Sequence, residues 1–161
     1  MTIATAAKVR DLPDAVAWRE RQAGSVVFTN GVFDLIHPGH VELLERARRE
    51  GDCLVVGLNS DSSVRRLGKG SGRPINSEAA RARVVAGFGA VDCVVLFDGD
   101  TPIDLIERLE PDVLVKGADY RRETIVGADF VESRGGRVVR VPLVDGYSTT
   151  SMVERLRASP R

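Results

Sequence analysis

The sequence predicts an α/β fold, a single Rossmann-like, doubly wound domain with a five-stranded parallel sheet. Five short apolar runs rich in β-branched residues have the length of buried strands, and stretches with helical spacing alternate with them. Strand, helix and strand units of this length place neighbouring strands parallel, with a right-handed crossover. No linker or internal repeat interrupts the 161 residues, a length that suits one domain with a real core.

Residues 1–10 carry no periodic pattern and are expected to be a loose N-terminal arm, so the domain is expected to span residues 11–161. The first helix begins after the arm, because Pro13 stands early and Asp11 and Asp14 place acids at its start. The expected elements then run in this order: this helix up to Gly24, a strand at 25–30, a helix at about 38–50, a strand at 53–58, a short helix carrying Val64 and Leu67, a helix at about 77–88, a strand at 92–97, a helix at about 101–110, a strand at 111–116, a helix at about 122–134, a strand at 137–141 and a helix that begins at Ser148 or Thr149.

Local signals support these boundaries. Gly51 and the pair that starts at Gly135 close helices, because glycine tolerates the backbone conformation found just past a helix end. Ser77 is the expected N-cap of the helix at 77–88, and Thr101 followed by proline repeats a capping pattern. Residues 68–74 hold three glycines, one lysine and one arginine, which predicts a mobile basic loop.

The composition excludes several classes of protein. Lysine plus arginine equals aspartate plus glutamate at 23 each, so the net charge of about zero gives no support to a nucleic-acid or anionic-membrane partner. No run is long and apolar enough to span a bilayer, and the first ten residues lack the apolar core of a signal peptide, so a cytoplasmic protein is expected. Cys53 and Cys93 begin predicted strands, where buried, inert thiols are common, and a disulfide is not expected.

The chemistry is predicted to centre on the stretch 29–40, TNGVFDLIHPGH, which joins the first predicted strand to a helix. Asn30-Gly31 supplies a tight bend where the backbone can approach a ligand, and Pro38 opens the helix where a proline costs nothing. The first-turn amides of that helix are then available to an anion. His37 and His40 stand three residues apart at the same helix start, so both imidazoles can face one bound phosphate.

A structural reading of the two histidines is the alternative, either as polar residues at a helix start or as part of a zinc site. Zinc needs more ligands, and neither cysteine lies on a predicted ligand-facing loop, so no metal site is expected in the protein itself. Transfer of a nucleotidyl group needs positioning and charge neutralisation rather than a protein nucleophile. The stretch is therefore interpreted as a phosphate-handling site.

The order of motifs resembles that of the cytidylyltransferase-like nucleotidyltransferases, the HxGH family. The resemblance rests on the HxGH stretch and extends through most of the chain: Asn59-Ser60-Asp61, Arg73-Pro74, residues 113–120 with the sequence VLVKGADY, and residues 146–150 with the sequence GYSTT. Within the family, the chain is most similar to the adenylyltransferases of heptose 1-phosphate. The HxGH motif alone is moderately specific, whereas all of these motifs in order form a strong signal.

The resemblance implies a role for each motif residue. The expected catalytic residues are His37, His40 and Lys69; the expected nucleotide-binding residues are Thr29, Asn30, Gly31, Phe33, Gly39, Arg81, Gly117, Asp119, Tyr147, Ser148, Thr149 and Thr150; the expected substrate-binding residues are Asp34, Asn59, Arg73 and Lys116. The usual form of the lysine motif runs Arg-Leu-Lys-Gly, whereas this chain has Arg66-Leu67-Gly68-Lys69, so the expected catalytic lysine is displaced by one residue.

Several of these residues also have a plainer interpretation from local sequence. Lys69 and Lys116 fit solvated charges, Arg81 fits a surface position, and Ser148 to Thr150 fit a helix N-cap. Asp34 stands so close to the phosphate site that it would repel an anion unless it held magnesium, oriented a histidine or bonded sugar hydroxyls. The resemblance favours a substrate or structural role for Asp34 without choosing between them.

The resemblance implies an enzyme that transfers AMP from ATP, with Mg²⁺ bridging phosphates, to D-glycero-β-D-manno-heptose 1-phosphate, giving ADP-heptose and pyrophosphate for lipopolysaccharide or another surface heptose. It also implies a homo-oligomer, as a dimer, and a separate heptose kinase, since many relatives carry this domain behind a sugar kinase. Two other functions stay open: a cytidylyltransferase for glycerol 3-phosphate or a similar small phosphate ester, and a non-catalytic nucleotide-binding regulatory module.

Overall fold

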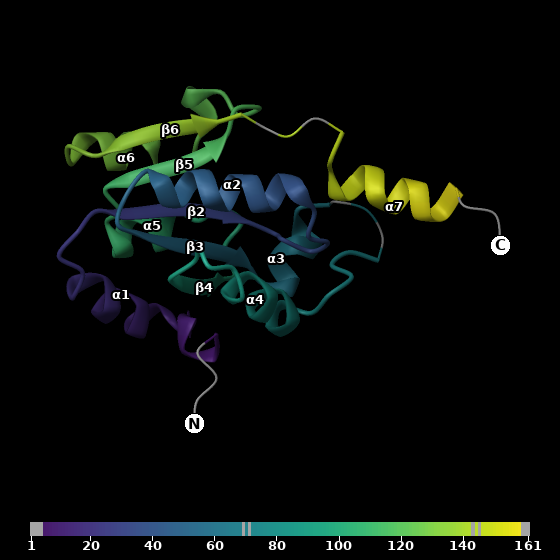
Figure 1. The fold of residues 1–161 in the computed structure, drawn as a ribbon, viewed down its shortest axis with the longest axis horizontal. Helices are drawn as coiled ribbons and strands as arrows, with labels where there is room; N and C mark the ends of the chain where they lie inside the picture. The colour runs from purple at the N-terminus through teal and green to yellow at the C-terminus, as the bar shows by residue number, and fades with distance from the viewer. Residues whose placement is uncertain (1–4, 69, 71, 143, 145, 159–161) are drawn as a thin grey trace.

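The computed structural model describes residues 5–68, 70, 72–142, 144 and 146–158. Within these residues the strands form one parallel sheet with helices on both faces (Figure 1), which confirms the predicted fold class. The strands are β1 Val9–Arg10, β2 Val26–Gly31, β3 Cys53–Asn59, β4 Cys93–Phe97, β5 Val113–Gly117 and β6 Arg137–Val141. The helices are α1 Leu12–Glu20, α2 Pro38–Arg49, α3 Asp61–Arg66, α4 Glu78–Ala86, α5 Ile103–Leu109, α6 Ala128–Ser133 and α7 Thr149–Ala158, with 3-10 turns η1 Ala6–Lys8 and η2 Arg122–Thr124.

The sheet has six strands in the described residues, so the predicted number of five is one too few. The additional strand is β1, in which Val9 and Arg10 pair with Val94 and Val95 at the edge of β4. Two residues carry no periodic signal, and they become a strand because β4 offers them unpaired backbone groups. The last two residues of the expected arm therefore belong to the sheet.

The helix predicted at 122–134 is also different in the structure, where it divides into η2 and α6. Gly127 separates them with a φ of +83°, and a Cβ at this position would lie 2.7 Å from Cδ1 of Ile106. The chain leaves the helical conformation there in order to pack closely on α5. The capping prediction for Ser77 is confirmed, since its side chain accepts from the N–H of Ala80. The side chain of Asp11 caps α1 in the same way and accepts from the N–H of Asp14.

Side chains on opposite faces of the sheet build two apolar clusters. Val27, Leu54 and Val56 face α2 and α4, whereas Phe28 and Val55 face α1, α5 and α6. Burial on both faces explains why the central strands read as continuous apolar runs in the sequence. Both cysteines are free and lie in the second cluster or at its edge, and burial raises their thiol pKa values to about 11, as expected of inert thiols.

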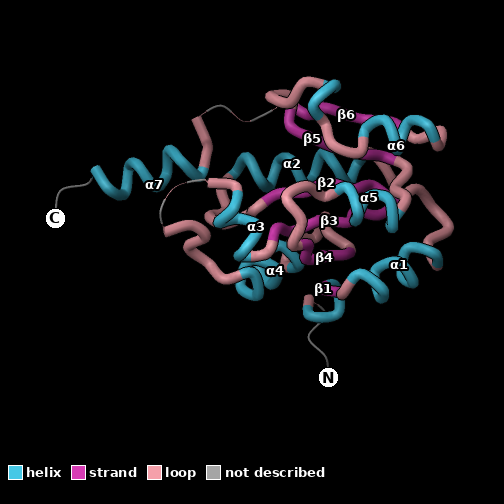
Figure 2. Tube along the Cα trace, turned by 180° about the vertical axis from the view of Figure 1, so that it is seen from behind, coloured by secondary structure: helices cyan, strands magenta, loops and turns pink. Residues whose placement is uncertain are grey.

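The strand order β1-β4-β3-β2-β5-β6 places the topological switch between β2 and β5. After β2 the chain builds one half of the sheet through β3 and β4, and it returns to pair β5 with the other side of β2. Parallel sheets bind ligands at the carboxyl ends of the strands beside such a switch. Both views show the start of α2 and the start of α7 at this end of the sheet, with α7 reaching beyond it (Figures 1 and 2). None of the helices in the described ranges has the length and apolar character needed to cross a membrane.

Candidate active site

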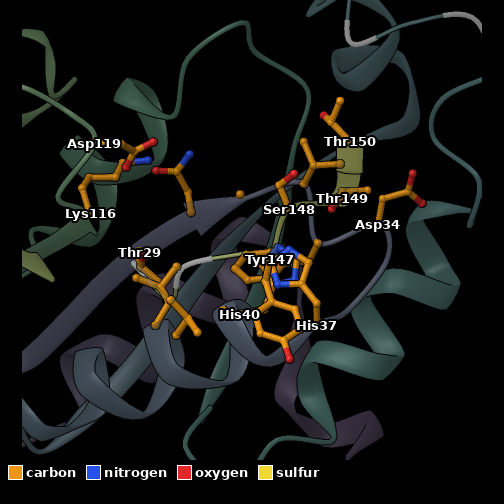
Figure 3. Close-up of a pocket in the computed structure, with 18 of the residues that line it drawn as sticks. Thr29, Asp34, His37, His40, Lys116, Asp119, Tyr147, Ser148, Thr149 and Thr150 are labelled. Atoms are coloured by element: carbon orange, nitrogen blue, oxygen red, sulfur yellow. The ribbon is translucent and has the colours of Figure 1, made fainter. Parts of the chain in front are cut away.

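A cavity of about 480 Å³ opens at the carboxyl ends of β2 and β5 (Figure 3). Its lining comes from four segments: the β2–α2 connection, the end of β5, the start of α7, and Arg73. It brings together most of the residues selected from the sequence, namely Thr29, Asn30, Gly31, Phe33, Asp34, His37, Gly39, His40, Arg73, Lys116, Gly117, Asp119, Tyr147, Ser148, Thr149 and Thr150. Sequence motifs that are far apart in the chain therefore share one site.

The two histidines lie face to face in this cavity. Their ring centroids are 3.8 Å apart and their planes are inclined by 23°, while the ring of Phe33 packs 5.1 Å from that of His40. His37 is the N-cap residue of α2 but makes no capping bond with its side chain, and its buried Nδ1 atom has no hydrogen-bond partner among the described residues. Burial lowers the pKa of His37 below 6.5, so the imidazole is neutral at neutral pH.

Gly39 is what allows the imidazole of His37 to lie against the start of α2. A Cβ on Gly39 would lie 3.0 Å from both Cε1 and Nδ1 of His37, a distance at which the ring would have to shift. Pro38, at the first position of the helix, has no N–H to satisfy. The HxGH spacing thus produces a close-packed pair of imidazoles beside the positive end of the α2 dipole.

Two buried polar atoms at the end of β2 line the cavity without a partner among the described residues. They are the hydroxyl Oγ1 of Thr29 and the amide oxygen Oδ1 of Asn30. An unsatisfied buried polar atom costs about 1–3 kcal/mol, which a ligand that supplies the missing hydrogen bond can restore. Both atoms therefore stand where a bound ligand could supply a hydrogen bond.

The end of β5 forms the wall on the other side of the switch. Lys116 is buried, and its ammonium lies 5.2 Å from the ring centroid of Tyr120. Figure 3 shows Lys116 and Asp119 together on one side of the histidine pair. Tyr120 also lines the cavity and was not selected from the sequence, although the motif VKGADY contains it and its position next to Asp119 was the available signal.

The start of α7, near the C-terminus of the chain, forms another wall of the cavity. The ring of Tyr147 lies 6.3 Å from that of His37 with a mutual inclination of 23°. Ser148 accepts from the N–H of Ser151, so the predicted N-cap is present, and the Thr149 hydroxyl donates to the Leu35 carbonyl at 3.5 Å. This last contact ties α7 to the β2–α2 connection.

Asp34 is held by the segment that follows α3. Its carboxylate accepts from Arg73 Nε at 2.8 Å, from the N–H of Ile75 at 2.9 and 3.0 Å and from the N–H of Asn76 at 2.9 Å. Burial raises the pKa of Asp34, but these amides and the Arg73 guanidinium together lower it by more than burial raises it. The net pKa therefore lies below 3.8, and the carboxylate is ionised. Of the roles left open by the sequence, the structure shows a structural one.

Arg81 is not at the cavity, although it was expected to contact the nucleotide. Its guanidinium is buried and donates to the Val32 carbonyl at 2.7 Å, to Asp61 at 2.8 Å and to the Asn76 carbonyl at 3.1 Å. Local sequence gives no sign of these partners, because each belongs to another segment. Arg81 fixes the backbone that leads into the HxGH motif.

Asn59 lines a second cavity of about 220 Å³, which shares Asn30, Gly31, Val32, Lys116 and Tyr120 with the first. Its Nδ2 donates to the Ser63 hydroxyl at 3.0 Å, which holds the side chain at the end of β3. The shared residues form a common wall between the two spaces. Lys69, the expected catalytic lysine, lies outside the described residues.

A family model described as cytidylyltransferase-like matches residues 28–155, which include every described segment of the cavity. The chain belongs to the cytidylyltransferase-like family. It is therefore a nucleotidyltransferase, as the order of motifs predicts.

Curated relatives agree with this assignment to the cytidylyltransferase-like family. The protein of Syntrophotalea carbinolica named Bifunctional protein HldE is 57% identical over 145 residues, covering 90% of this chain and 29% of that protein. The protein of the same name from Hyphomonas neptunium is 61% identical over 138 residues, covering 85% of this chain and 28% of that protein. The chain thus spans less than a third of the length of either relative.

Solved structures show the same fold. The lipopolysaccharide core biosynthesis protein from Thermoplasma volcanium has a TM-score of 0.64 and 26% identity, covering 78% of this chain and all of that one. Pantoate-beta-alanine ligase from Francisella tularensis, solved with an ATP analogue and β-alanine, has a TM-score of 0.60 and 14% identity over 83% of this chain and 66% of that one. The second likeness concerns the fold alone.

Side chains that could act as metal ligands are dispersed over the described residues. These residues hold no cluster of three or more histidine, cysteine, aspartate or glutamate side chains with the spacing of a metal site. Asp34, three residues before the HxGH motif, has both oxygens engaged by Arg73 and backbone amides. A magnesium ion in this cavity would fit only as part of the nucleotide, with phosphate oxygens as its main ligands.

Proposed function

We propose that this chain is the adenylyltransferase that transfers AMP from ATP to D-glycero-β-D-manno-heptose 1-phosphate, releasing ADP-heptose and pyrophosphate for lipopolysaccharide inner-core or other surface heptose biosynthesis. The choice of ATP and heptose rests on the resemblance of the motifs to heptose 1-phosphate adenylyltransferases. The relatives named Bifunctional protein HldE and the lipopolysaccharide core biosynthesis protein support it.

The observation that carries the proposal is the stacked pair of His37 and His40 at the start of α2, opposite the start of α7 in one cavity. Two helix starts and two imidazoles surround this space, which suits direct transfer between phosphates because such transfer needs positioning and charge neutralisation and requires no protein nucleophile. An oxygen of the sugar phosphate attacks the α-phosphorus of ATP. The bond from that phosphorus to the bridging oxygen breaks, and pyrophosphate leaves with the electron pair.

In this reaction the imidazoles act as hydrogen-bond donors to the α-phosphate and the leaving pyrophosphate. His37 is neutral in the free protein because burial lowers its pKa. The negative charge of a bound phosphate favours the protonated, positively charged form of the imidazole. Charge that develops in the transition state then meets donors already in place, which is where such donors contribute most. Lys116 and Lys69 are the lysines proposed to neutralise the remaining phosphate charge.

The two adjoining cavities suggest how the substrates are arranged. We assign ATP to the larger cavity, where the histidines and the start of α7 lie, and the sugar phosphate to the smaller one beside Asn59. The shared wall of Asn30 to Val32 and Lys116 is then the place where the attacking oxygen meets the α-phosphorus. Magnesium would be held as part of the bound ATP, mainly by phosphate oxygens, and would supply positive charge that stabilises the leaving pyrophosphate.

The resemblance of the motifs also supports proposals on the cellular location, the source of the sugar phosphate and the oligomeric state. We propose that it works in the cytoplasm, takes its sugar phosphate from a separate heptose kinase and forms a homodimer. Size-exclusion chromatography with light scattering measures the last of these directly, and a monomer at all working concentrations would contradict it.

The experiment that tests the function measures pyrophosphate release by the purified protein with magnesium. Each of the four ribonucleoside triphosphates is paired with heptose 1-phosphate, glycerol 3-phosphate and other small phosphate esters. Release with ATP and heptose 1-phosphate alone is the expected result. Release with CTP and glycerol 3-phosphate would assign the chain to the cytidylyltransferase alternative, and nucleotide binding without release from any pair would favour the regulatory module.

A further inference from the structure

The geometry around Asp34 points to a role for this residue that the motif resemblance does not assign. We propose that Asp34 is a positioning residue, which holds Arg73 so that the free end of its guanidinium binds a substrate phosphate in the main cavity. This inference rests on the proposed function, since it takes the ligand to be a phosphate of ATP or of the sugar phosphate.

Asp34 itself is closed to substrate. Its side chain is 0% exposed, and each of its oxygens accepts two hydrogen bonds: Oδ1 from the N–H groups of Ile75 and Asn76, and Oδ2 from Arg73 Nε and the N–H of Ile75. Three donors engage this carboxylate, with the N–H of Ile75 shared between both oxygens, and its complete burial leaves no room for a sugar hydroxyl or a metal ion. Any effect of Asp34 on the reaction must therefore pass through the groups it holds.

Arg73 is in the opposite situation. It lines the main cavity, its side chain is 10% exposed, and its contact with Asp34 uses only Nε. Within the described part of the chain, no hydrogen bond engages its Nη1 and Nη2 atoms. A guanidinium presents its donors in a rigid fork, so fixing Nε also fixes the direction of the other two nitrogens.

The two residues also connect two loops that contribute to the lining of the cavity. Asp34 stands in the β2–α2 connection three residues before His37, and Arg73 stands in the connection between α3 and α4, 39 residues further along the chain. The carboxylate compensates the charge of Arg73 while phosphate is absent. When phosphate binds, the arginine supplies charge-assisted bonds without first losing side-chain freedom.

A double-mutant cycle with Asp34→Asn and Arg73→Gln tests the proposal through kcat/KM for ATP and heptose 1-phosphate. We expect each single variant to lose on the order of 10- to 100-fold, the range of a charged hydrogen bond, and Asp34→Asn to cost less than about threefold when Arg73 is already Gln. If Asp34→Asn costs the same factor in both backgrounds, Asp34 does not act through Arg73 and the proposal is wrong.

Two further variants protect the test against a general loss of folding. Asp112→Asn is a matched control, because Asp112 likewise accepts from an arginine and a backbone N–H, those of Arg19 and Val26, at the opposite end of the strands. The Asp112→Asn variant should lower the free energy of unfolding and leave kcat/KM unchanged. Arg73→Lys keeps a positive charge beside Asp34, but the single nitrogen of lysine cannot reproduce the forked donors of the guanidinium. We therefore expect kcat/KM to fall at least tenfold, and full activity would overturn the proposal.

Titration calorimetry separates this inference from the proposed reaction, because it requires no turnover. Magnesium with ATP and heptose 1-phosphate are titrated separately into wild type, Arg73→Gln, Asp34→Asn and the double variant. The titrant whose dissociation constant rises at least tenfold identifies the phosphate that Arg73 binds. An absence of turnover would count against the proposed function alone, whereas unchanged dissociation constants for both titrants would overturn the role of Arg73 and Asp34.

Discussion

Replacing Gly39 with alanine should separate activity from stability at the HxGH motif. The new Cβ would lie 3.0 Å from Cε1 and Nδ1 of His37, so the imidazole must move by a few tenths of an ångström or turn away. Gly39 has no positive φ, which means that alanine is compatible with the backbone. The stack of His37 on His40, with centroids 3.8 Å apart, is the feature that has to change.

The expected magnitudes follow from this geometry. A displaced ring misaligns its hydrogen bond to phosphate, for which we expect a fall in kcat of about 10- to 100-fold. The strain on the ring, about 0.5–1.5 kcal/mol, is offset by the better helix propensity of alanine, about 1 kcal/mol, so the free energy of unfolding should change by less than about 1 kcal/mol.

Pyrophosphate release measures the first quantity and urea denaturation the second. Gly89→Ala is the matched control, because Gly89 is exposed and a Cβ there meets nothing within 4 Å, so both quantities should stay at the wild-type value. A Gly39→Ala variant with wild-type kcat and KM would refute the argument that the close stack of imidazoles serves the reaction.

Three other predictions address the remaining parts of the site. His40→Ala should lower kcat about 10²- to 10⁴-fold while the ATP dissociation constant measured by calorimetry changes less than about tenfold; equal losses would indicate a binding role instead. Arg81→Met should lower the free energy of unfolding in urea by about 3–5 kcal/mol, because Asp61 and the Val32 carbonyl lose a buried partner; a raised KM for ATP at unchanged stability would instead favour nucleotide contact. The pKa of Asp34 is below 3.8 in the folded state, so its contribution to stability is present above pH 3.8 and is lost as the pH falls through the folded pKa; Asp34→Asn should flatten this part of the acid unfolding curve, and an unchanged slope would contradict the lowered pKa.

The fold class and the group of residues that lines the main cavity could be predicted from the sequence, because both depend on local signals. The apolar runs predicted the central strands, and β2 and β3 pair in parallel as expected from one crossover. His37, Gly39 and His40 lie within four consecutive residues at the start of α2, so their proximity follows from local sequence. The order of the motifs then predicted the family, and the family model confirmed it.

The contacts of Arg81, Asp34 and the N-terminal segment could not be predicted from the sequence, because they join segments that are far apart in the chain. Arg81 donates to a carbonyl 49 residues before it, and the partners of Asp34 stand 39 to 42 residues after it. Such pairs carry no periodic or motif signal, since the two partners lie far apart in the chain and most of the partners are backbone groups that every residue possesses. The same reason applies to β1, which is a strand because an edge of β4 is available beside it rather than because of its two residues.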